Sequence, residues 1–240
     1  MNDLSQTNSA RQTMLRNMMD VIANNIANMS TPGFKSENLL FKEYVNKNQD
    51  EGDKGVQAKN SSGYRDLSQG ILSPTFNKFD LALQGEGYFG VQTPDGVKYT
   101  RAGAFSLNNK KEIVTKSGYP VLSDGDTPLV VQPGASAITV AENGTVSSEK
   151  GNIGKLKLVK FENPQSVVPA GDNLFDADSA GELPAEDLKV AQGMLENSNV
   201  QPVFEMNKMI EIIRMYQSTQ NIVTTDHEMI RGMIQKLTKV

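Results

Sequence analysis

Apolar positions recur with a helical period near the start of the chain. Between Ser9 and Met29 there is no glycine or proline, and the apolar residues follow one another at alternating steps of four and three. These residues are Leu15, Met19, Ile22, Ile26 and Met29. The spacing predicts one helix whose apolar face is a heptad seam, and Pro32 and Gly33 are expected to end it.

The same period returns over a longer stretch at the C-terminal end. Heptad positions are occupied by Met209, Tyr216, Val223, Ile230 and Leu237, and they are flanked by Met206, Ile210 and Ile213. Asn199 is a candidate N-cap, and Pro202 suits the first turn of a helix. We therefore predict a second long helix from about Val200 to about Lys239.

Between these helices the pattern changes to short apolar runs that are interrupted by turn residues. Residues 93–96 read Thr-Pro-Asp-Gly, and 143–144 read Asn-Gly, while residues 155–158 alternate lysine with leucine. Such alternation and turn spacing predict an all-β domain of many short strands, a barrel or a sandwich. Residues 46–62 are polar and are expected to form an extended or mobile linker.

The patterns together predict an α+β fold in which long N- and C-terminal helices pair as a coiled-coil-like unit and an all-β domain is inserted between them. The expected segments are an N-terminal helix and turn over 1–45, a linker over 46–75, a β domain over 76–190 and a C-terminal helix over 191–240. Two helices alone bury little apolar surface against the entropy cost of ordering them. We therefore expect the helices to order fully only when neighbouring copies cover them.

Composition excludes several classes of function. The 240 residues include no cysteine and one histidine, and the net charge is −4. Disulfides, thiolate metal sites and multi-histidine metal sites are therefore excluded, and there is no basic excess that would favour nucleic acid. No apolar stretch reaches the ~18 residues that a membrane-spanning helix needs, and the first 30 residues lack the apolar core of a cleaved signal peptide.

None of the candidate cofactor, metal or catalytic sites in the sequence has the neighbouring residues that such a site needs. Residues 85–90 form a G-x-G-x-x-G string, but strand and turn residues follow it instead of a helix, so the glycines indicate a bend or bulge. Asp176, Asp178 and Gly181 begin like a calcium loop, yet Ala180 and Asp187 stand at ligand positions that need other side chains. His227 is interpreted as a solvated or interface residue. We expect no enzyme activity, no cofactor and no metal.

Longer strings resemble a known family. Residues 20–28 (DVIANNIAN) and 30–35 (STPGFK) closely resemble the N-terminal signature of the flagellar basal-body rod proteins, a family that includes rod and hook axial proteins. The resemblance continues in residues 80–89, 99–105, 171–175 and 195–200. Runs 10–20 and 36–44 look most like the proximal-rod branch. The alternatives are a distal rod or other axial protein and, from a different class, a secreted β-domain that binds a ligand.

The resemblance implies a structural subunit that polymerises through its terminal helices into a torque-transmitting tube. It also implies a place in the basal body, in the rod that crosses the periplasm, and secretion by the flagellum's own type III export apparatus. The implied partners are copies of the chain, neighbouring rod proteins and that apparatus. The expected assembly interface combines both apolar seams with Asn24, Asn25 and Asn28, which are expected to hydrogen-bond between helices, and with Pro32, Gly33 and Phe34 at the turn.

Overall fold

The computed structural model describes residues 2–41, 61–135, 137–177, 181–185 and 187–237. The chain divides into two compact units. The helical unit comprises Met1–Ala27, Glu37–Arg65 and Gln201–Val240, and the β unit comprises Asn28–Ser36 and Asp66–Val200. Residues 46–60 of the predicted linker lie outside the described residues.

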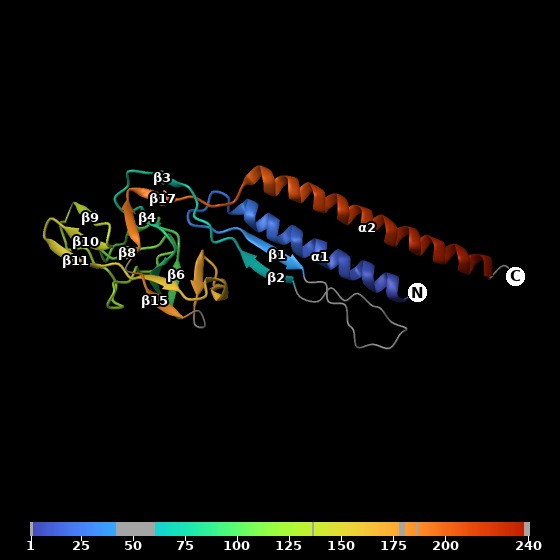
Figure 1. Cartoon of the computed structure of the whole chain (residues 1–240), viewed down its shortest axis with the longest axis horizontal. Coiled ribbons are helices and arrows are strands. Elements are labelled where there is room, and N and C mark those ends of the chain that lie inside the picture. Colours follow the sequence, from blue (N-terminus) through green and yellow to red (C-terminus); the bar gives the residue numbers. More distant parts are fainter. Residues whose placement is uncertain (1, 42–60, 136, 178–180, 186, 238–240) are drawn as a thin grey trace. The chain divides into compact units, whose positions relative to one another are not determined.

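The helical unit is built from two antiparallel helices and one hairpin. Helix α1 spans Asn2–Ala27 and helix α2 spans Pro202–Leu237, so proline occupies the first turn of α2 as predicted. Strands β1 (Glu37–Phe41) and β2 (Ser61–Arg65) pair antiparallel, and β1 lies beside α1 (Figure 1). The hairpin was not predicted, because its strands carry few alternating apolar residues. None of the described helices is long and apolar enough to cross a membrane.

The β unit contains the remaining strands and one short 3-10 helix at Pro164–Ser166. The strands are β3 (Leu72–Pro74), β4 (Leu81–Gln84), β5 (Tyr88–Thr93), β6 (Gly96–Thr100), β7 (Ser106–Leu107), β8 (Ile113–Val114), β9 (Ile138–Val140), β10 (Thr145–Ser148), β11 (Gly151–Lys155), β12 (Leu158–Phe161), β13 (Val168–Pro169), β14 (Leu174–Asp176), β15 (Glu182–Pro184), β16 (Lys189–Gln192) and β17 (Met194–Glu196). The largest sheet has the order β13-β14-β6-β5-β12-β15. Smaller sheets are β11-β10-β9, β16-β4, β17-β3 and β7-β8, and every pairing between these strands is antiparallel.

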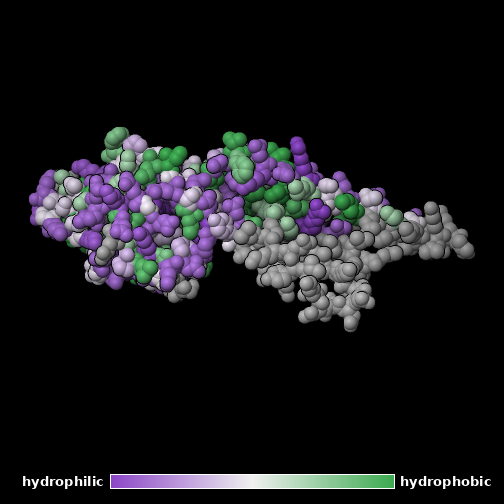
Figure 2. All heavy atoms as spheres, viewed as in Figure 1, coloured by the Kyte–Doolittle hydropathy of each residue, from purple (hydrophilic) through white to green (hydrophobic). Residues whose placement is uncertain are grey.

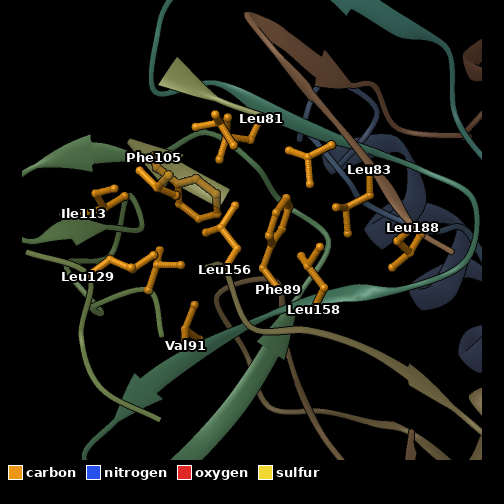
Figure 3. Packing of buried hydrophobic residues seen from close by; sticks show 14 of the residues in the cluster. Leu81, Leu83, Phe89, Val91, Phe105, Ile113, Leu129, Leu156, Leu158 and Leu188 are labelled. Atoms are coloured by element: carbon orange, nitrogen blue, oxygen red, sulfur yellow. The ribbon is translucent and has the colours of Figure 1, made fainter. Parts of the chain in front are cut away.

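The core of the β unit lies between these sheets. Phe89 and Phe105 meet edge to face with ring centroids 5.2 Å apart, and Leu81, Leu83 and Leu156 pack around them (Figure 3). A second cluster gathers four aromatic rings, those of Tyr88, Tyr99, Phe161 and Phe175. Edge-to-face aromatic contacts of this kind add to the free energy gained by burying the rings. The β unit therefore has an apolar core of its own.

The α+β fold class predicted from the sequence is wrong. In the described part of the chain there are two α-helices against seventeen strands, and a half-barrel sheet dominates the β unit, so the chain is mainly β. The prediction gave the helices too much weight because their long 3.6-residue periodicity is a stronger signal than strands of two to six residues. The inserted all-β domain itself is present.

Candidate assembly interface

The face that α2 turns toward α1 is a heptad seam with polar members. Met209, Tyr216 and Val223 are half-buried, and the side chains of Glu205 and Thr219 are buried. Together with Ile212 these residues follow one another at steps of four and three, which is the spacing of a helix–helix seam. The sequence pattern does not predict three of these residues, Glu205, Ile212 and Thr219. Glutamate and threonine are polar and therefore do not stand out as seam residues. Ile212 does not stand out because apolar residues occur on several faces of this helix.

The matching face of α1 carries four of the five residues of the predicted N-terminal seam, while the fifth, Met29, lies beyond the end of α1 and is 44% exposed. Leu15 and Ile22 are buried, and Met19 and Ile26 are half-buried. The Nη2 atom of Arg16 lies 3.4 Å from the hydroxyl of Tyr216, across the pair. The two helices therefore run antiparallel, with the start of α2 beside the end of α1 (Figure 1).

Asn25 fixes the register at that end of the pair. Its side chain is fully buried, at 0% exposure. The Nδ2 atom donates to the carbonyl oxygen of Glu37 at 2.8 Å and to Oε2 of Glu205 at 3.2 Å, and Oδ1 accepts the backbone N–H of Glu37 at 3.0 Å. One amide thus joins α1, β1 and α2. A buried amide with satisfied partners specifies one register, because any slip would leave it unpaired.

The other two asparagines of the motif are placed differently. Asn24 is exposed on α1. Asn28 belongs to the β unit, where its Oδ1 accepts the hydroxyl of Thr31 at 3.1 Å. The side chain of Asn25 thus bonds to Glu205 of α2.

The face of α2 that points away from the seam is rich in exposed apolar side chains. Exposure ranges from 69% at Val203 to 39% at Ile213. The exposed set is Val203, Phe204, Met206, Ile210, Ile213, Met215, Ile222 and Met229. Figure 2 shows apolar atoms gathered over the first half of α2. The side chains of Ile230, Leu237 and His227 lie outside those that the structure describes.

The exposed face of α1 is different in kind. It carries Arg11, Asn17 and Asp20, which are polar or charged. Exposed apolar patches on soluble domains mark surfaces that bind other molecules. In the helical unit, α2 therefore offers the apolar surface that a partner would cover. Met206, Ile210 and Ile213, predicted beside the seam, lie on this face.

The turn after α1 belongs to the β unit and is tightly held there. Gly33 has φ +69, and its N–H donates to the carbonyl oxygen of Glu196 at 2.8 Å. A Cβ at this position would lie 2.5 Å from the carbonyl carbon of Arg101, so glycine is required both by conformation and by space. The carbonyl of Pro32 accepts Nδ2 of Asn173 at 2.9 Å, and Phe34 is half-buried.

A buried ion triad lies next to this turn. Glu196 pairs through Oε1 with Nζ of Lys35 at 2.6 Å and through Oε2 with Nε of Arg101 at 2.7 Å. The side chains of Lys35, Arg101 and Glu196 are 5%, 3% and 2% exposed. Burial lowers the pKa of Lys35, while the hydrogen bond to Glu196 opposes that shift.

The remaining donors of the triad are satisfied by backbone carbonyls. Lys35 also donates to the carbonyl of Ser68 at 2.7 Å. Arg101 donates to the carbonyls of Leu83, Gly85 and Gly87, at 3.0, 2.7 and 2.6 Å. Each buried charge therefore has partners, as a stable buried ion pair requires.

Asn199 joins the same region and does not cap α2, which begins at Pro202. Its Oδ1 accepts the N–H of Ser36 at 2.7 Å, and its Nδ2 donates to the carbonyl of Asp66 at 2.9 Å. The segments that precede β1 and α2 are thus tied to one another inside the β unit.

The glycine string at 85–90 lies between two strands. Gly85 has φ +100 just after β4, and Gly90 lies within β5. No helix opens at the third glycine, so the geometry of a dinucleotide-binding turn is not formed. The carbonyls of Gly85 and Gly87 instead accept hydrogen bonds from Arg101.

Comparisons with known proteins agree with this architecture. Three family models match the chain: Flagella basal body rod protein over residues 6–35, Flagellar hook protein FlgE/F/G D1 domain over 82–148, and Flagellar basal body rod FlgEFG protein C-terminal over 191–236. Lys35, Arg101 and Glu196 fall in the first, second and third of these segments respectively, so the ion triad links all three.

Relatives match over almost the whole chain. The flagellar basal-body rod protein FlgF of Caulobacter vibrioides is 37% identical over 235 residues, which cover 96% of each chain. FlgF of Mesorhizobium japonicum is 32% identical over 87% of this chain and 86% of its own, and FlgG of Bacillus subtilis is 32% identical over 90% and 92%. The chain belongs to the flagellar basal-body rod protein family.

Proposed function

We propose that copies of this chain, together with neighbouring rod proteins, polymerise through α1 and α2 into a torque-transmitting tube. As a member of its family, the chain is a structural, non-enzymatic subunit of the proximal rod of the flagellar basal body. FlgF relatives reach 37% identity, and the FlgG of Bacillus subtilis reaches 32%, which favours the proximal over the distal rod. The assembled rod crosses the periplasm in this proposal, and the flagellar type III export apparatus secretes the chain.

The observation that carries the proposal is the exposed apolar face of α2. Eight large apolar side chains of this helix are exposed in the described part of the helical unit. Each costs free energy in water, and burial recovers roughly 25 cal/mol per Å² of apolar surface. A surface that repeats along a helix and meets a different surface on the next copy generates an open filament instead of a closed dimer. We therefore place the helical unit in the inner wall and the β unit in the outer layer.

Self-association of the full chain tests this proposal. Sedimentation velocity over a rising concentration series should show growing oligomers for the unmodified chain. A double variant, Ile210→Asp with Ile213→Asp, places two carboxylates on the exposed face and should shift association to at least tenfold higher concentration. The control Val168→Asp changes an exposed apolar residue of the β unit and should associate like the unmodified chain.

Two results would count against the proposal. The unmodified chain could remain monomeric throughout the series, or the double variant could associate as well as the unmodified chain. In either case the exposed face of α2 is not the assembly surface.

A further inference from the structure

The most exposed large apolar side chain in the described part of the molecule is that of Phe76. It is 89% exposed and lies in the turn between β3 and β4. Its backbone has φ +60, in the left-handed region that suits glycine and that bulky residues rarely adopt. The sequence thus keeps an aromatic ring in water at a position where the backbone conformation disfavours it.

The turn that carries Phe76 is well fixed. The backbone N–H groups of Thr75 and Phe76 both donate to the carbonyl of Gly193, at 2.8 and 3.1 Å. Asn77 accepts the N–H of Phe79 through Oδ1 and donates through Nδ2 to Oδ1 of Asp80 at 3.0 Å. Such a turn presents the ring at a set position. Strain that is held in place by its surroundings is a feature of binding and catalytic sites.

The helical unit offers an acceptor of matching chemistry. A groove of about 210 Å³ lies among α1, β1 and α2, and its apolar lining consists of Met18, Val21, Ile22, Leu39 and Ile212. An apolar cavity of about 150 Å³ is large enough to bind benzene. The groove can therefore take the benzyl group of one phenylalanine.

The polar part of the groove's lining is Glu37, Asn38 and Lys208, so one charge of each sign stands beside the apolar residues. A second groove, on α2 alone, is lined by Asn207, Glu211, Arg214 and Ser218 beside Ile210 and Met215, so it is a poorer site for a phenyl ring.

We propose that Phe76 of one copy inserts into this groove on the helical unit of a second copy. The inference rests on the proposed function, because it specifies one contact of the assembly. The ring lies on the β unit and the groove on the helical unit, so donor and acceptor surfaces differ. A contact of this heterologous kind is repeated from copy to copy and is open at both ends.

Photo-crosslinking between isotopically distinct copies tests the contact. The full chain carrying p-benzoylphenylalanine at position 76 is mixed with unmodified chain labelled with ¹⁵N, and the mixture is irradiated at concentrations where it associates. Mass spectrometry should find mixed-isotope crosslinks to residues 18–22, 37–39 or 212. The proposal is overturned if the crosslinks stay within one copy, if they reach other segments, or if the associated protein gives no crosslinks.

A strain-relieving variant provides a second readout. Phe76→Gly suits the local backbone, so its melting temperature should equal or exceed that of the unmodified chain, while self-association should weaken at least fivefold. Met18→Asp, which places a carboxylate in the groove, should weaken association similarly, and Val168→Ser should leave it unchanged. A lower melting temperature for Phe76→Gly, or unchanged association, contradicts the inference.

The outcomes separate this contact from the proposed function. If the unmodified chain and Phe76→Gly associate equally well, the Phe76 contact is refuted and assembly through α2 is not. If the unmodified chain never associates, both proposals are refuted.

Discussion

At the scale of single residues, Glu196 links distant segments of the β unit. Its carboxylate forms ion pairs with the buried side chains of Lys35 and Arg101. No spacing in the sequence links these residues, because they are brought together only by the fold. The sequence strings that contain Arg101 and Glu196 pointed to the family but not to their pairing.

The first prediction concerns that carboxylate. Glu196→Gln leaves Lys35 and Arg101 buried beside a neutral amide, and breaking a buried ion pair in this way costs about 3–5 kcal/mol. Urea unfolding followed by tyrosine fluorescence should show this loss, since Tyr88 and Tyr99 lie in the core of the β unit. The exposed control Glu86→Gln should unfold like the unmodified chain, and equal stability of the two variants would contradict the role of the triad.

The second prediction concerns the pH dependence of Lys35. Burial lowers its pKa below the ordinary value of 10.5. As pH rises through the lowered pKa towards 10.5, the folded chain releases this proton while the unfolded chain still holds it, so the free energy of unfolding rises. The stability of the unmodified chain relative to Lys35→Met should therefore increase with pH in the window just below 10.5. Urea titrations at several alkaline pH values measure it, and a flat or falling difference would refute it.

The third prediction concerns Asn25. Asn25→Ala leaves the N–H and carbonyl of Glu37 and one oxygen of Glu205 without this partner, at a cost of about 1–3 kcal/mol for each buried group left unsatisfied. Thermal melting of the helices followed by circular dichroism should show a clear loss of stability in the associated protein. Asn17→Ala, on the exposed face of α1, is the matched control. Similar melting of both variants would mean that Asn25 does not fix the register.

At the scale of elements, the sequence predicts the helices better than the faces they use. Of the five residues that the sequence predicts for the seam of the first helix, Leu15, Met19, Ile22 and Ile26 are buried or half-buried on α1, whereas Met29 lies beyond its end and is 44% exposed. In α2 apolar residues occur on several faces, so periodicity alone could not decide whether Ile212 or Ile213 faces α1. The hairpin β1–β2 was missed because polar strands give no alternation to detect.

The fourth prediction separates the two units. The β unit ends at Val200 and includes Glu196, so a chain that stops after Gln201 keeps every residue of that unit. It should retain the cooperative unfolding of the β unit seen by tyrosine fluorescence and lose self-association. A chain that stops after Leu195 lacks Glu196 and should be far less stable. Equal stability of the two truncated chains would show that the last residues of the β unit contribute little.

At the scale of the whole molecule, both large buried apolar clusters among the described residues belong to the β unit. The β unit closes around Phe89, Phe105 and their neighbours, whereas α2 leaves much of its apolar surface in water. The sequence predicts such a division, because two helices alone bury too little apolar surface to offset the entropy cost of ordering them. The sequence does not predict that residues 28–36 belong to the β unit, because their place there depends on contacts between distant segments.

Hydrogen exchange with mass spectrometry, on the full chain before and after self-association, tests most directly whether α1 and α2 are the assembling elements. In dilute solution the amides of α1 and α2 should exchange quickly while the strands of the β unit are protected, and association should protect both helices. Helices that are already fully protected in the dilute chain, or whose exchange does not slow on association, would contradict assembly through α1 and α2.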